Sequence, residues 1–575
     1  MSWTEAIKAS ALAPGHTMVF KQGTHQIALV RTEDGSVYGV DNRCPHEGYP
    51  LAEGSVSGCV LTCNWHNYKF DLRDGSCVMG EEAVRSYPTR EKNGHIEVDL
   101  SEPDPEQAKA TLWRSLDVGM VDNRMGRVAR DVVRLLVLGV EPSEIAAYGA
   151  RWDALHAEWG SSHALPVAAD ILHWCDAAPG PDAAIPLTQF LDIASRPHVR
   201  RPERTRPDRI DPGEDSEAAR LRFLVAVEEE DAELAEGIIR GAIAKGWTWD
   251  TLRPWLLEAV SAHHLDFGHA LIYLDKLDAL ISRIGWQHAD PIVTSFVFGV
   301  VNGTREDLLP EWRRIRTHLD GLKGEWDALY VACTAEADSA WDGAEALTDA
   351  ILNGRRGDVL SALTESLRHR APLVTLVDIL SRAAAERMLR FDVAHDADPS
   401  LQDSWLSVTH IQTYAAALRS AVERHDHPCL LRLLFFGAVF CNKARGLDVK
   451  DYTPTEPWPT HDGLGPLMEA IIHKRRPEAL SRVLAWTEAR ADLGPLRASL
   501  MQAAVSDVVT RPIVVAHVIK NTIVGFDEAK TMDSAMPLLA LAALMSSPLS
   551  ERRIHRISRE AVAFVTQGKV PRSIM

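Results

Sequence analysis

Two short pairs of cysteine and histidine lie close together near the start of the chain. Cys44 and His46 are separated by one residue, sixteen residues follow, and Cys63 and His66 are then separated by two. Thiolates and imidazoles spaced in this way are ligands for zinc or for an iron–sulfur cluster. The pattern therefore predicts two loops that a metal group holds together, and it leaves both kinds of metal group open.

The residues around these pairs predict short strands. TMVF, HQIALVR and SVYGVDN alternate in polarity or are β-branched, and HIEVDL closes the series. Asp34-Gly35 and Asp74-Gly75 are typical of tight hairpin turns, and Asn93-Gly94 precedes the last strand. We therefore expect an all-β domain over residues 1–102, followed by a linker that begins with SEPDPEQ at 101–107.

The spacing of the ligands separates the two kinds of metal group. Zinc sites usually place cysteine with cysteine and histidine with histidine, whereas here each pair is mixed and lies between predicted strands. Together with CPHEGYPLAEGSV, WHNYKFDLRDG and the closing strand, the motif resembles the Rieske [2Fe–2S] family over about 100 residues. The resemblance implies that Cys44 and Cys63 bind a buried iron, and that His46 and His66 bind an outer iron near solvent.

Two departures from the family pattern concern the cluster's surroundings. Asn64 and Asn67 occupy positions where many ferredoxin-like members have Cys-Pro before the second histidine and glycine after it. The extra disulfide of respiratory-chain members is also missing, because Glu47 and Asn64 stand there. We therefore expect a ferredoxin-like cluster of lower potential, with a potential that depends on pH through the imidazole ligands.

Helical periodicity begins after the linker and continues to the C-terminus. GRVARDVVRLLVLG, EAARLRFLVAVEEED and PEALSRVLAWTEAR carry apolar residues at i, i+3 and i+4. Residues 196–215 are rich in proline and arginine, and we interpret them as a surface loop. The chain is thus expected to be multi-domain, with a large all-α domain at 103–575 that contains about four degenerate repeats stacked as a solenoid or closed bundle. The predicted units are roughly 108–215, 216–330, 331–450 and 451–575.

The repeats are marked by histidines. Residues 132–165 and 238–271 align over their length, and both end in His-Ala-Leu, at His163 and His269. Glu158 and His264 lie five positions earlier, which on an unbroken helix would put them on another face. We expect a helix break at Gly160-Ser161-Ser162 and at Asp266 to Gly268, with Asp266 and the serines as N-caps. A looser third copy carries His395 and His410, and a fourth carries His517 without an upstream partner.

These residues suggest a second redox centre in the helical domain. Histidines and carboxylates on facing helices bind iron in helix bundles, and open coordination positions allow iron to activate oxygen. Tyr273 and Tyr414, four residues after a candidate histidine, could orient ligands or substrate. The alternative is that histidines cap helices and satisfy buried carbonyls, which is plausible in a chain with 23 of them. The candidate ligands, for non-haem iron or a haem, are Glu158, His163, His264, His269, His395 and His410.

The helical part also has weak resemblances. HHLDFGHALIYLDKL and VTHIQTYAAALR resemble segments of bacterial proteins that fuse a Rieske domain to a helical region, and they are similar to the questin oxidase-like family of helical oxygenases. Ring-hydroxylating oxygenases also join a Rieske domain to iron, and His264-x4-His269 matches their histidine pair by spacing. Their catalytic half needs a long sheet, however, and the helical periodicity excludes one here.

The net charge and the sequence motifs limit the classes of partner that we expect for this protein. The net charge of −18 disfavours nucleic acid, no apolar run approaches the ~18 residues of a membrane span, and the N-terminus lacks a secretion pattern, so we expect a cytoplasmic protein. Without a glycine-rich nucleotide fingerprint, electrons would come from a separate ferredoxin or flavin reductase. A homo-oligomer is also expected.

Two classes of function remain. In the first, the cluster passes single electrons to the helical site for the oxygen-dependent oxidation of a small organic substrate, as in a monooxygenase. In the second, the protein transfers electrons or senses redox state, and its helical domain is a protein-interaction scaffold without a second metal.

Overall fold

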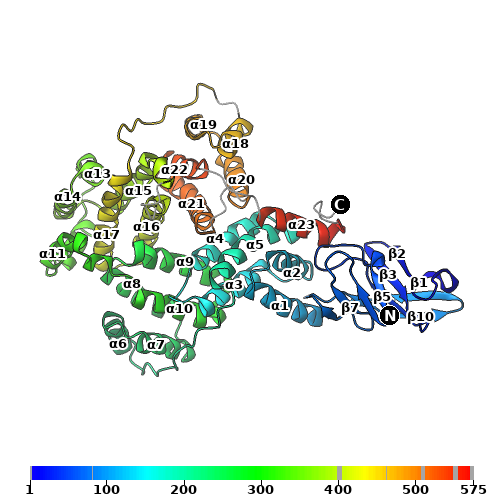
Figure 1. The fold of residues 1–575 in the computed structure, drawn as a ribbon. Coiled ribbons are helices and arrows are strands. Elements are labelled where there is room, and N and C mark those ends of the chain that lie inside the picture. The colour runs from blue at the N-terminus through cyan, green and yellow to red at the C-terminus, as the bar shows by residue number, and fades with distance from the viewer. Residues whose placement is uncertain are drawn as a thin grey trace. The chain divides into compact units, whose positions relative to one another are not determined.

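The computed structural model describes residues 3–80, 82–397, 404–460, 463–506, 512–547 and 554–569 (Figure 1). The chain divides into two compact units. Unit 1 contains residues 1–141, 178–188 and 554–575, and unit 2 contains residues 142–177 and 189–553. The change from strands to helices falls between Asp99 and Pro105, close to the predicted boundary at 102/103. Unit 1 extends beyond the strands, because it also contains three helices.

The strands of unit 1 form three antiparallel sheets in the orders β1-β11-β10, β2-β3-β4-β9 and β5-β6-β7-β8. Their bounds are β1 (Trp3–Lys8), β2 (Thr17–Gln22), β3 (His25–Arg31), β4 (Val37–Asp41), β5 (Ser55–Ser57), β6 (Val60–Thr62), β7 (Lys69–Asp71), β8 (Cys77–Met79), β9 (Ser86–Tyr87), β10 (Thr89–Lys92) and β11 (His95–Asp99).

The two predicted hairpin turns are confirmed, and Asn93-Gly94 forms a third. Gly35 joins β3 to β4 with φ +87°, Gly75 joins β7 to β8 with φ +76°, and Asn93-Gly94 joins β10 to β11 with φ values of 50° and 76°. Glycine and asparagine are the residues that tolerate this left-handed backbone. The local sequence therefore determines the register of the pairs that it joins.

Strand β3 is apolar over its four central residues, 27–30, because they contribute to two cores. Ala28 and Val30 face one core, which also contains Leu61 and Phe70. Ile27 and Leu29 alternate with them and face a second core with Tyr87 and Ile96. Side chains alternate between the faces of a strand, so burial on both faces explains the unbroken apolar run. The first core also includes Cys44 and Cys63.

The other long elements of the described chain are helices. In unit 1 they are α1 (Pro105–Val121), α2 (Met125–Val137) and α23 (Ile554–Gln567), and α5 (Ala184–Ser195) contains the division between the units. In unit 2 they are α3 (Pro142–His156), α4 (Ala164–Ala177), α6 (Ser216–Glu228), α7 (Ala232–Ala244), α8 (Trp249–Ala262), α9 (His269–Ile284), α10 (Ala289–Asn302), α11 (Arg313–Gly321), α12 (Trp326–Cys333), α13 (Ala344–Asn353), α14 (Arg356–Arg368), α15 (Leu373–Arg390), α16 (Ser404–Arg424), α17 (Cys429–Lys443), α18 (Leu464–Ile472), α19 (Arg476–Glu488), α20 (Leu493–Ala504), α21 (Pro512–Thr531) and α22 (Met536–Met545).

The predicted linker is shorter than 101–107, because helix α1 begins inside it. Asp104 caps the helix by accepting a hydrogen bond from the backbone N–H of Gln107 at 3.0 Å, and Pro105 occupies the first helical position. Aspartate at the N-cap followed by proline is a strong start signal, which the linker interpretation overlooked. The irregular stretch predicted at 196–215 is confirmed apart from a short 3-10 turn at Arg196–His198. Among the described residues, no helix combines the length and apolar character needed to cross a membrane.

The two predicted helix breaks in unit 2 are confirmed. Helix α3 ends at His156 and α4 begins at Ala164, with Gly160 between them at φ +96°. Helix α8 ends at Ala262 and α9 begins at His269, after three residues with positive φ at Asp266 to Gly268. Ser162 accepts a hydrogen bond from Ala164 N–H, as expected of a cap. Asp266 instead accepts from Thr304 N–H at 2.7 Å, so it anchors a neighbouring loop and does not cap α9.

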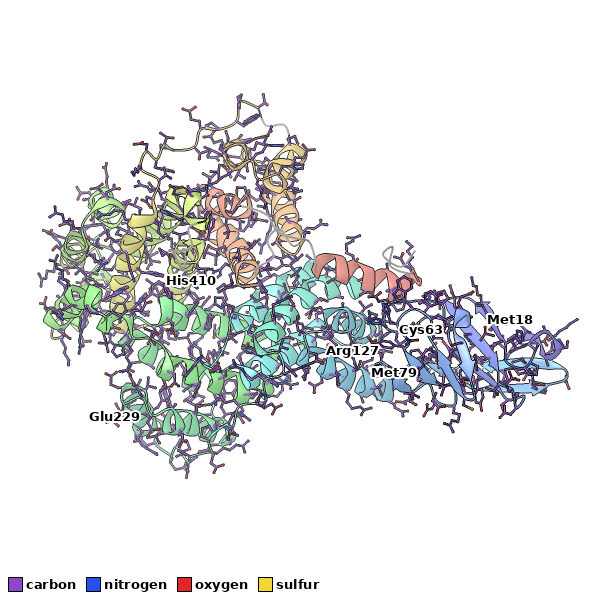
Figure 2. All side chains as sticks on the ribbon, viewed as in Figure 1. Met18, Cys63, Met79, Arg127, Glu229 and His410 are labelled. Atoms are coloured by element: carbon purple, nitrogen blue, oxygen red, sulfur yellow. The ribbon has the colours of Figure 1, made fainter. Side chains whose placement is uncertain are left out.

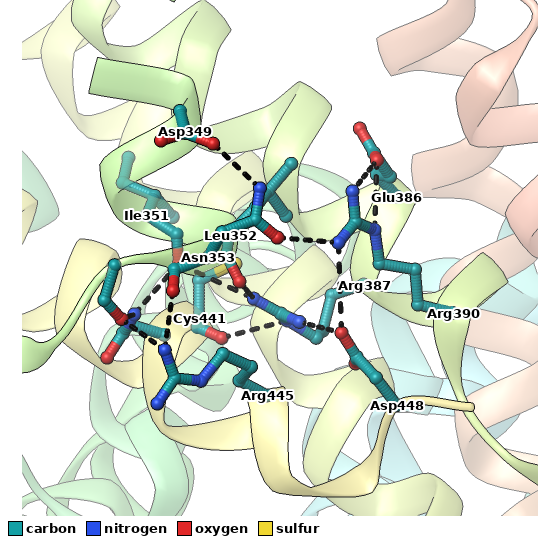
Figure 3. Close-up of polar contacts among 12 residues, drawn as sticks. Asp349, Ile351, Leu352, Asn353, Glu386, Arg387, Arg390, Cys441, Arg445 and Asp448 are labelled. Carbon is teal, nitrogen blue, oxygen red and sulfur yellow. Dashed lines mark hydrogen bonds and ion pairs between the residues drawn. The ribbon is translucent and has the colours of Figure 1, made fainter. Parts of the chain in front are cut away.

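A buried arginine joins four segments of unit 2 (Figure 3). Arg387 on α15 is fully buried, donates to the carbonyl oxygens of Cys441 and Leu352 at 3.1 and 2.8 Å, and pairs with Asp448. Its guanidinium thereby satisfies carbonyls at the ends of α13 and α17 that would otherwise lack donors.

We expect Asn442→Ala to lower the free energy of unfolding by about 1–3 kcal/mol, because two carbonyl oxygens would each lose one of their hydrogen-bond donors and a buried side chain would be truncated. Asn442 is 4% exposed, and its amide donates to the carbonyls of Ile351 and Gly354, both at 3.0 Å. Chemical unfolding followed by circular dichroism measures the effect. Asn353→Ala, at an exposed asparagine on α13, should change the free energy of unfolding by less than about 0.5 kcal/mol. Equal effects of the two substitutions would contradict the expectation.

Candidate metal centres

The first candidate centre lies on two loops of unit 1 with matching backbone geometry. In the loop after β4, Cys44 N–H donates to the Tyr49 carbonyl at 2.9 Å and Gly48 N–H donates back to the Cys44 carbonyl at 2.8 Å. In the loop between β6 and β7, Cys63 N–H donates to Tyr68 and Asn67 N–H donates to Cys63, at 2.8 and 3.1 Å. The repeated pair of bonds presents both cysteines and both following histidines in the same way.

The four predicted ligands face one another in pairs. Cys44 and Cys63 are 2% and 1% exposed, and their thiols are within hydrogen-bond reach of each other. The hydrogen bond from Cys44 lowers the pKa of Cys63 to about 6, with help from the backbone N–H groups of Trp65 and His66. His46 Nδ1 and His66 Nδ1 lie 3.2 Å apart, with His66 exposed. Figure 2 labels Cys63.

This donor set fits a two-iron cluster with one thiolate-bound and one imidazole-bound iron. The sulfur pair is buried beside the apolar core, the imidazole pair is nearer to solvent, and N–H groups point at the sulfurs. Hydrogen bonds of this kind tune the potential of an iron–sulfur cluster. Such a cluster carries one electron and needs no proton or group transfer.

The structure explains how the two asparagine departures are tolerated. Asn67 has φ +60°, equivalent to Gly48 at φ +79° in the other loop, and asparagine is among the few non-glycine residues that adopt this conformation readily. The Asn64 amide donates to the Glu53 carbonyl at 2.6 Å. The Asn67 backbone and the Asn64 side chain therefore maintain the loop that carries Cys63 and His66.

Aromatic rings border the histidine side of this centre. His46 stacks on Tyr68 with ring centres 4.7 Å apart and planes at 9°, and burial lowers its pKa. Trp65 is 47% exposed although it adjoins the predicted ligand His66, and it stacks on Tyr49 at 5.9 Å. An exposed indole beside the outer imidazoles is suited to contact with an electron-transfer partner.

The second candidate centre is a group of four histidines in unit 2, which we call the four-histidine cluster. His163 precedes α4, His269 begins α9, and His410 and His517 lie inside α16 and α21. Ring centres of neighbouring pairs are 4.3–5.0 Å apart. The Nε2 atoms of His410 and His269 are 2.6 Å apart, and those of His517 and His163 are 3.2 Å apart. One histidine comes from each of the four predicted units. Figure 2 labels His410 on its helix.

Burial keeps these four imidazoles neutral. It lowers the pKa of His269 to about 3, and it lowers the pKa values of the other three well below the ordinary value. The charge of Lys520, one turn after His517 on α21, lowers all four further. A neutral imidazole is the form that binds metal ions.

The structure does not bring the other predicted ligands to this cluster. Glu158 is exposed and pairs with Arg201 at 2.7 Å. His264 is buried, but its Nδ1 bonds to Glu306 at 2.8 Å and its ring stacks on Trp312 at 4.7 Å. His395 lies in a short 3-10 segment, with its ring 6.1 Å from that of Phe391.

The two candidate tyrosines differ in their surroundings. Tyr273 is buried with its ring 5.0 Å from His269 and 6.1 Å from His163, and burial raises its pKa well above the ordinary value. Tyr414 donates its hydroxyl to the Leu433 carbonyl at 2.9 Å, and its ring lies against His264 at 5.9 Å. Tyr273 therefore borders the cluster, whereas the Tyr414 hydroxyl is occupied by the backbone.

Sequence reasoning noted His517 in the fourth copy but did not include it among the ligands, because that copy has no upstream partner. A usable signal was present in VVAHVIKN, where His517, Lys520 and Asn521 interrupt an otherwise apolar helix. All three are completely buried. Polar residues grouped on one turn of a buried helix mark a polar site inside the core.

Comparison with known proteins places the first centre in a family. A model of the Rieske [2Fe-2S] domain matches residues 2–88. The ferredoxin component of the p-cumate 2,3-dioxygenase system of Pseudomonas putida is 32% identical over 92 residues, which are 16% of this chain and 78% of that protein.

The similarity covers a small part of this chain. Cholesterol 7-desaturase nvd of Hemicentrotus pulcherrimus is 30% identical over 129 residues, which are 19% of this chain and 28% of that protein, so the chain spans less than a third of the desaturase. Among solved structures, the ferredoxin of carbazole 1,9a-dioxygenase from Nocardioides aromaticivorans IC177 is 25% identical over 18% of this chain and 100% of its own, with a TM-score of 0.17.

Proposed function

The chain belongs, through residues 2–88, to the Rieske [2Fe-2S] domain family, and on this premise we propose that it is an oxidoreductase whose cluster passes single electrons to a second centre in the helical region. In this proposal Cys44 and Cys63 hold one iron, and His46 and His66 hold the other. The second centre supports the oxygen-dependent oxidation of a small organic molecule. The electrons come from a separate ferredoxin or flavin reductase, and the protein works as a homo-oligomer in the cytoplasm.

The observation that carries the proposal is the convergence of His163, His269 and His410, three of the predicted ligands, from separate parts of the sequence. A one-electron carrier needs an acceptor, and neutral imidazoles are suitable ligands for redox-active metals. Relatives of the Rieske domain are named as a dioxygenase ferredoxin component and as a desaturase, which supports oxygen-dependent chemistry. The helical region itself supplies the substrate site in this proposal.

The number of electrons that the protein accepts distinguishes the proposal from its alternative, in which the helical region is an interaction scaffold without a second metal. We expect the purified full-length protein, titrated anaerobically with dithionite, to accept more than one electron per [2Fe–2S] cluster, because a cluster of this type takes only one. The cluster is quantified in the same samples by its electron paramagnetic resonance signal. Uptake of one electron per cluster would leave the helical region without an acceptor, and would favour the electron-transfer or redox-sensing alternative.

A further inference from the structure

We propose that the four-histidine cluster binds a single first-row transition-metal ion, iron, through the Nε2 atoms of His163, His269, His410 and His517. The inference deepens the proposed function, on which it rests for the source of electrons, by identifying the acceptor. Four imidazoles leave one or two positions open on an iron that takes five or six ligands, which is the arrangement needed to bind dioxygen.

The spacing of the nitrogen atoms suits one ion. Nitrogen ligands about 2.1 Å from a metal and 90–109° apart are separated by about 3 Å. The Nε2 atoms of His517 and His163 are 3.2 Å apart, and those of His410 and His269 are 2.6 Å apart. The ligand atoms of His163, His410 and His517 all lie within 4.8 Å of one another. The His517–His163 pair already has the expected separation, and the His410–His269 pair would move slightly apart around an ion. His269 lies outside the group of three, so its ring would also move towards His163 and His517 on binding.

In two of the four rings, a hydrogen bond at Nδ1 leaves the Nε2 lone pair free to bind a metal ion. His410 Nδ1 lies 2.6 Å from the Leu406 carbonyl oxygen, which can only accept, so Nδ1 carries the proton and Nε2 presents a lone pair. His517 Nδ1 lies 3.2 Å from Thr409 Oγ1, whose own proton goes to the Trp405 carbonyl at 2.9 Å. The His517 Nε2 lone pair is therefore also free. Metal-binding histidines are usually held by such a bond from the second ring nitrogen.

A histidine core held only by hydrogen bonds is the competing explanation, since His163 and His269 could each donate to a partner ring. It does not account for Lys520. This side chain is fully buried beside the cluster, and its Nζ lacks a hydrogen-bond partner within the described structure. It also does not account for the left-handed backbone at Asp266 and Phe267 that places His269 at the start of α9. An unpaired buried amine and backbone strain persist where a function needs them.

The electrostatics of the site favour the lower oxidation state of its metal. Among the described residues, the group close enough to share one ion contains only histidines, so no anionic ligand offsets the charge of the metal. Burial in a medium of low dielectric makes each added positive charge more costly, and Lys520 adds to this effect. A ferric ion here would be a ready acceptor. The step balances: the reduced cluster loses one electron and the ferric ion becomes ferrous, without any bond made or broken.

Metal analysis of full-length variants tests the inference. We expect the wild-type protein, supplied with ferrous iron, to contain about one iron per chain beyond the two of the cluster. His410→Ala and His517→Ala should lose that iron completely while the cluster's paramagnetic resonance signal and labile sulfide stay unchanged. His156→Gln is the matched control, because His156 is buried in the same unit and bonds to the Trp152 carbonyl at 2.8 Å, so it should keep all the iron.

Several outcomes would overturn the inference. The wild-type protein could take up neither ferrous iron nor cobalt(II) beyond the cluster, or the alanine variants could retain the extra iron. The site could also prove to hold zinc, or the protein could show a haem absorption band. Should the alanine variants fail to fold, His410→Gln and His517→Gln keep the volume and must lose the same iron. The proposed function can fail separately from this inference. If the variants lose the extra iron but the wild-type protein accepts only one electron per cluster, the metal site is supported and electron transfer to it is not.

Discussion

Cys63→Ser is expected to abolish the [2Fe–2S] cluster and all electron transfer through the protein. Cys63 is 1% exposed, its thiolate is stabilised by Cys44 and by two backbone N–H groups, and a serine hydroxyl does not ionise at neutral pH to replace it as an iron ligand. The visible absorption, the paramagnetic resonance signal and the labile sulfide should all disappear. Oxygen consumption dependent on a reductase should fall to the background rate.

Cys77→Ser is the matched control for this result. Cys77 is partly buried against the same core and lies in strand β8 of the sheet that carries Cys63, but it belongs to neither ligand loop. Its cluster content should equal that of the wild type. A Cys63→Ser protein that retains a normal cluster would contradict the ligand assignment, as would a Cys77→Ser protein that loses it.

The β domain could be predicted closely because its information is local. The Asp-Gly and Asn-Gly turns determine the hairpins, and the four predicted ligands of the first centre lie within 23 consecutive residues. A local signal also marks the start of α1, because Asp104 is a typical N-cap residue and Pro105 is a typical first helical residue. The interpretation of 101–107 as a linker missed this signal. Short-range patterns of this kind need no knowledge of tertiary contacts.

The second centre was only partly predictable because tertiary partners decide it. Helix breaks at Gly160 and Gly268 could be read from the sequence, and they do bring His163 and His269 together. His264 has the same local appearance, yet Glu306, 42 positions away, holds its ring nitrogen. His517 lies in an unbroken and mostly apolar helix, where only the nearby Lys520 and Asn521 distinguish it from an ordinary core residue. Whether a histidine joins the cluster depends on which other chain segments lie close to it, and hydrophobic periodicity does not predict those distances.

Lys520→Met is expected to stabilise the protein at pH 7, by about 3–5 kcal/mol when metal has been removed by a chelator. Burial lowers the pKa of Lys520 to about 7, from an ordinary value of 10.5. Between these values the unfolded chain binds a proton that the folded chain does not, so stability falls as the pH falls from 10.5 towards 7. At about 1.4 kcal/mol per pH unit, the penalty at pH 7 is about 4–5 kcal/mol, and methionine avoids it. Chemical unfolding at pH 7 and pH 10 should show the gain shrinking at the higher pH.

Lys276→Met should have the opposite sign, which makes it a sharp control for the same fold and the same chemical change. Lys276 is also buried, but its ammonium bonds to Asp170 at 2.9 Å, and neighbouring carboxylates raise its pKa despite burial. Removing it leaves a buried carboxylate unpaired, which costs about 3–5 kcal/mol. A Lys520→Met protein that is less stable than the wild type at pH 7 would mean that the amine has a partner in solution. A more stable one would mean that the chain keeps a destabilising amine beside four histidines, which selection retains where a site needs it.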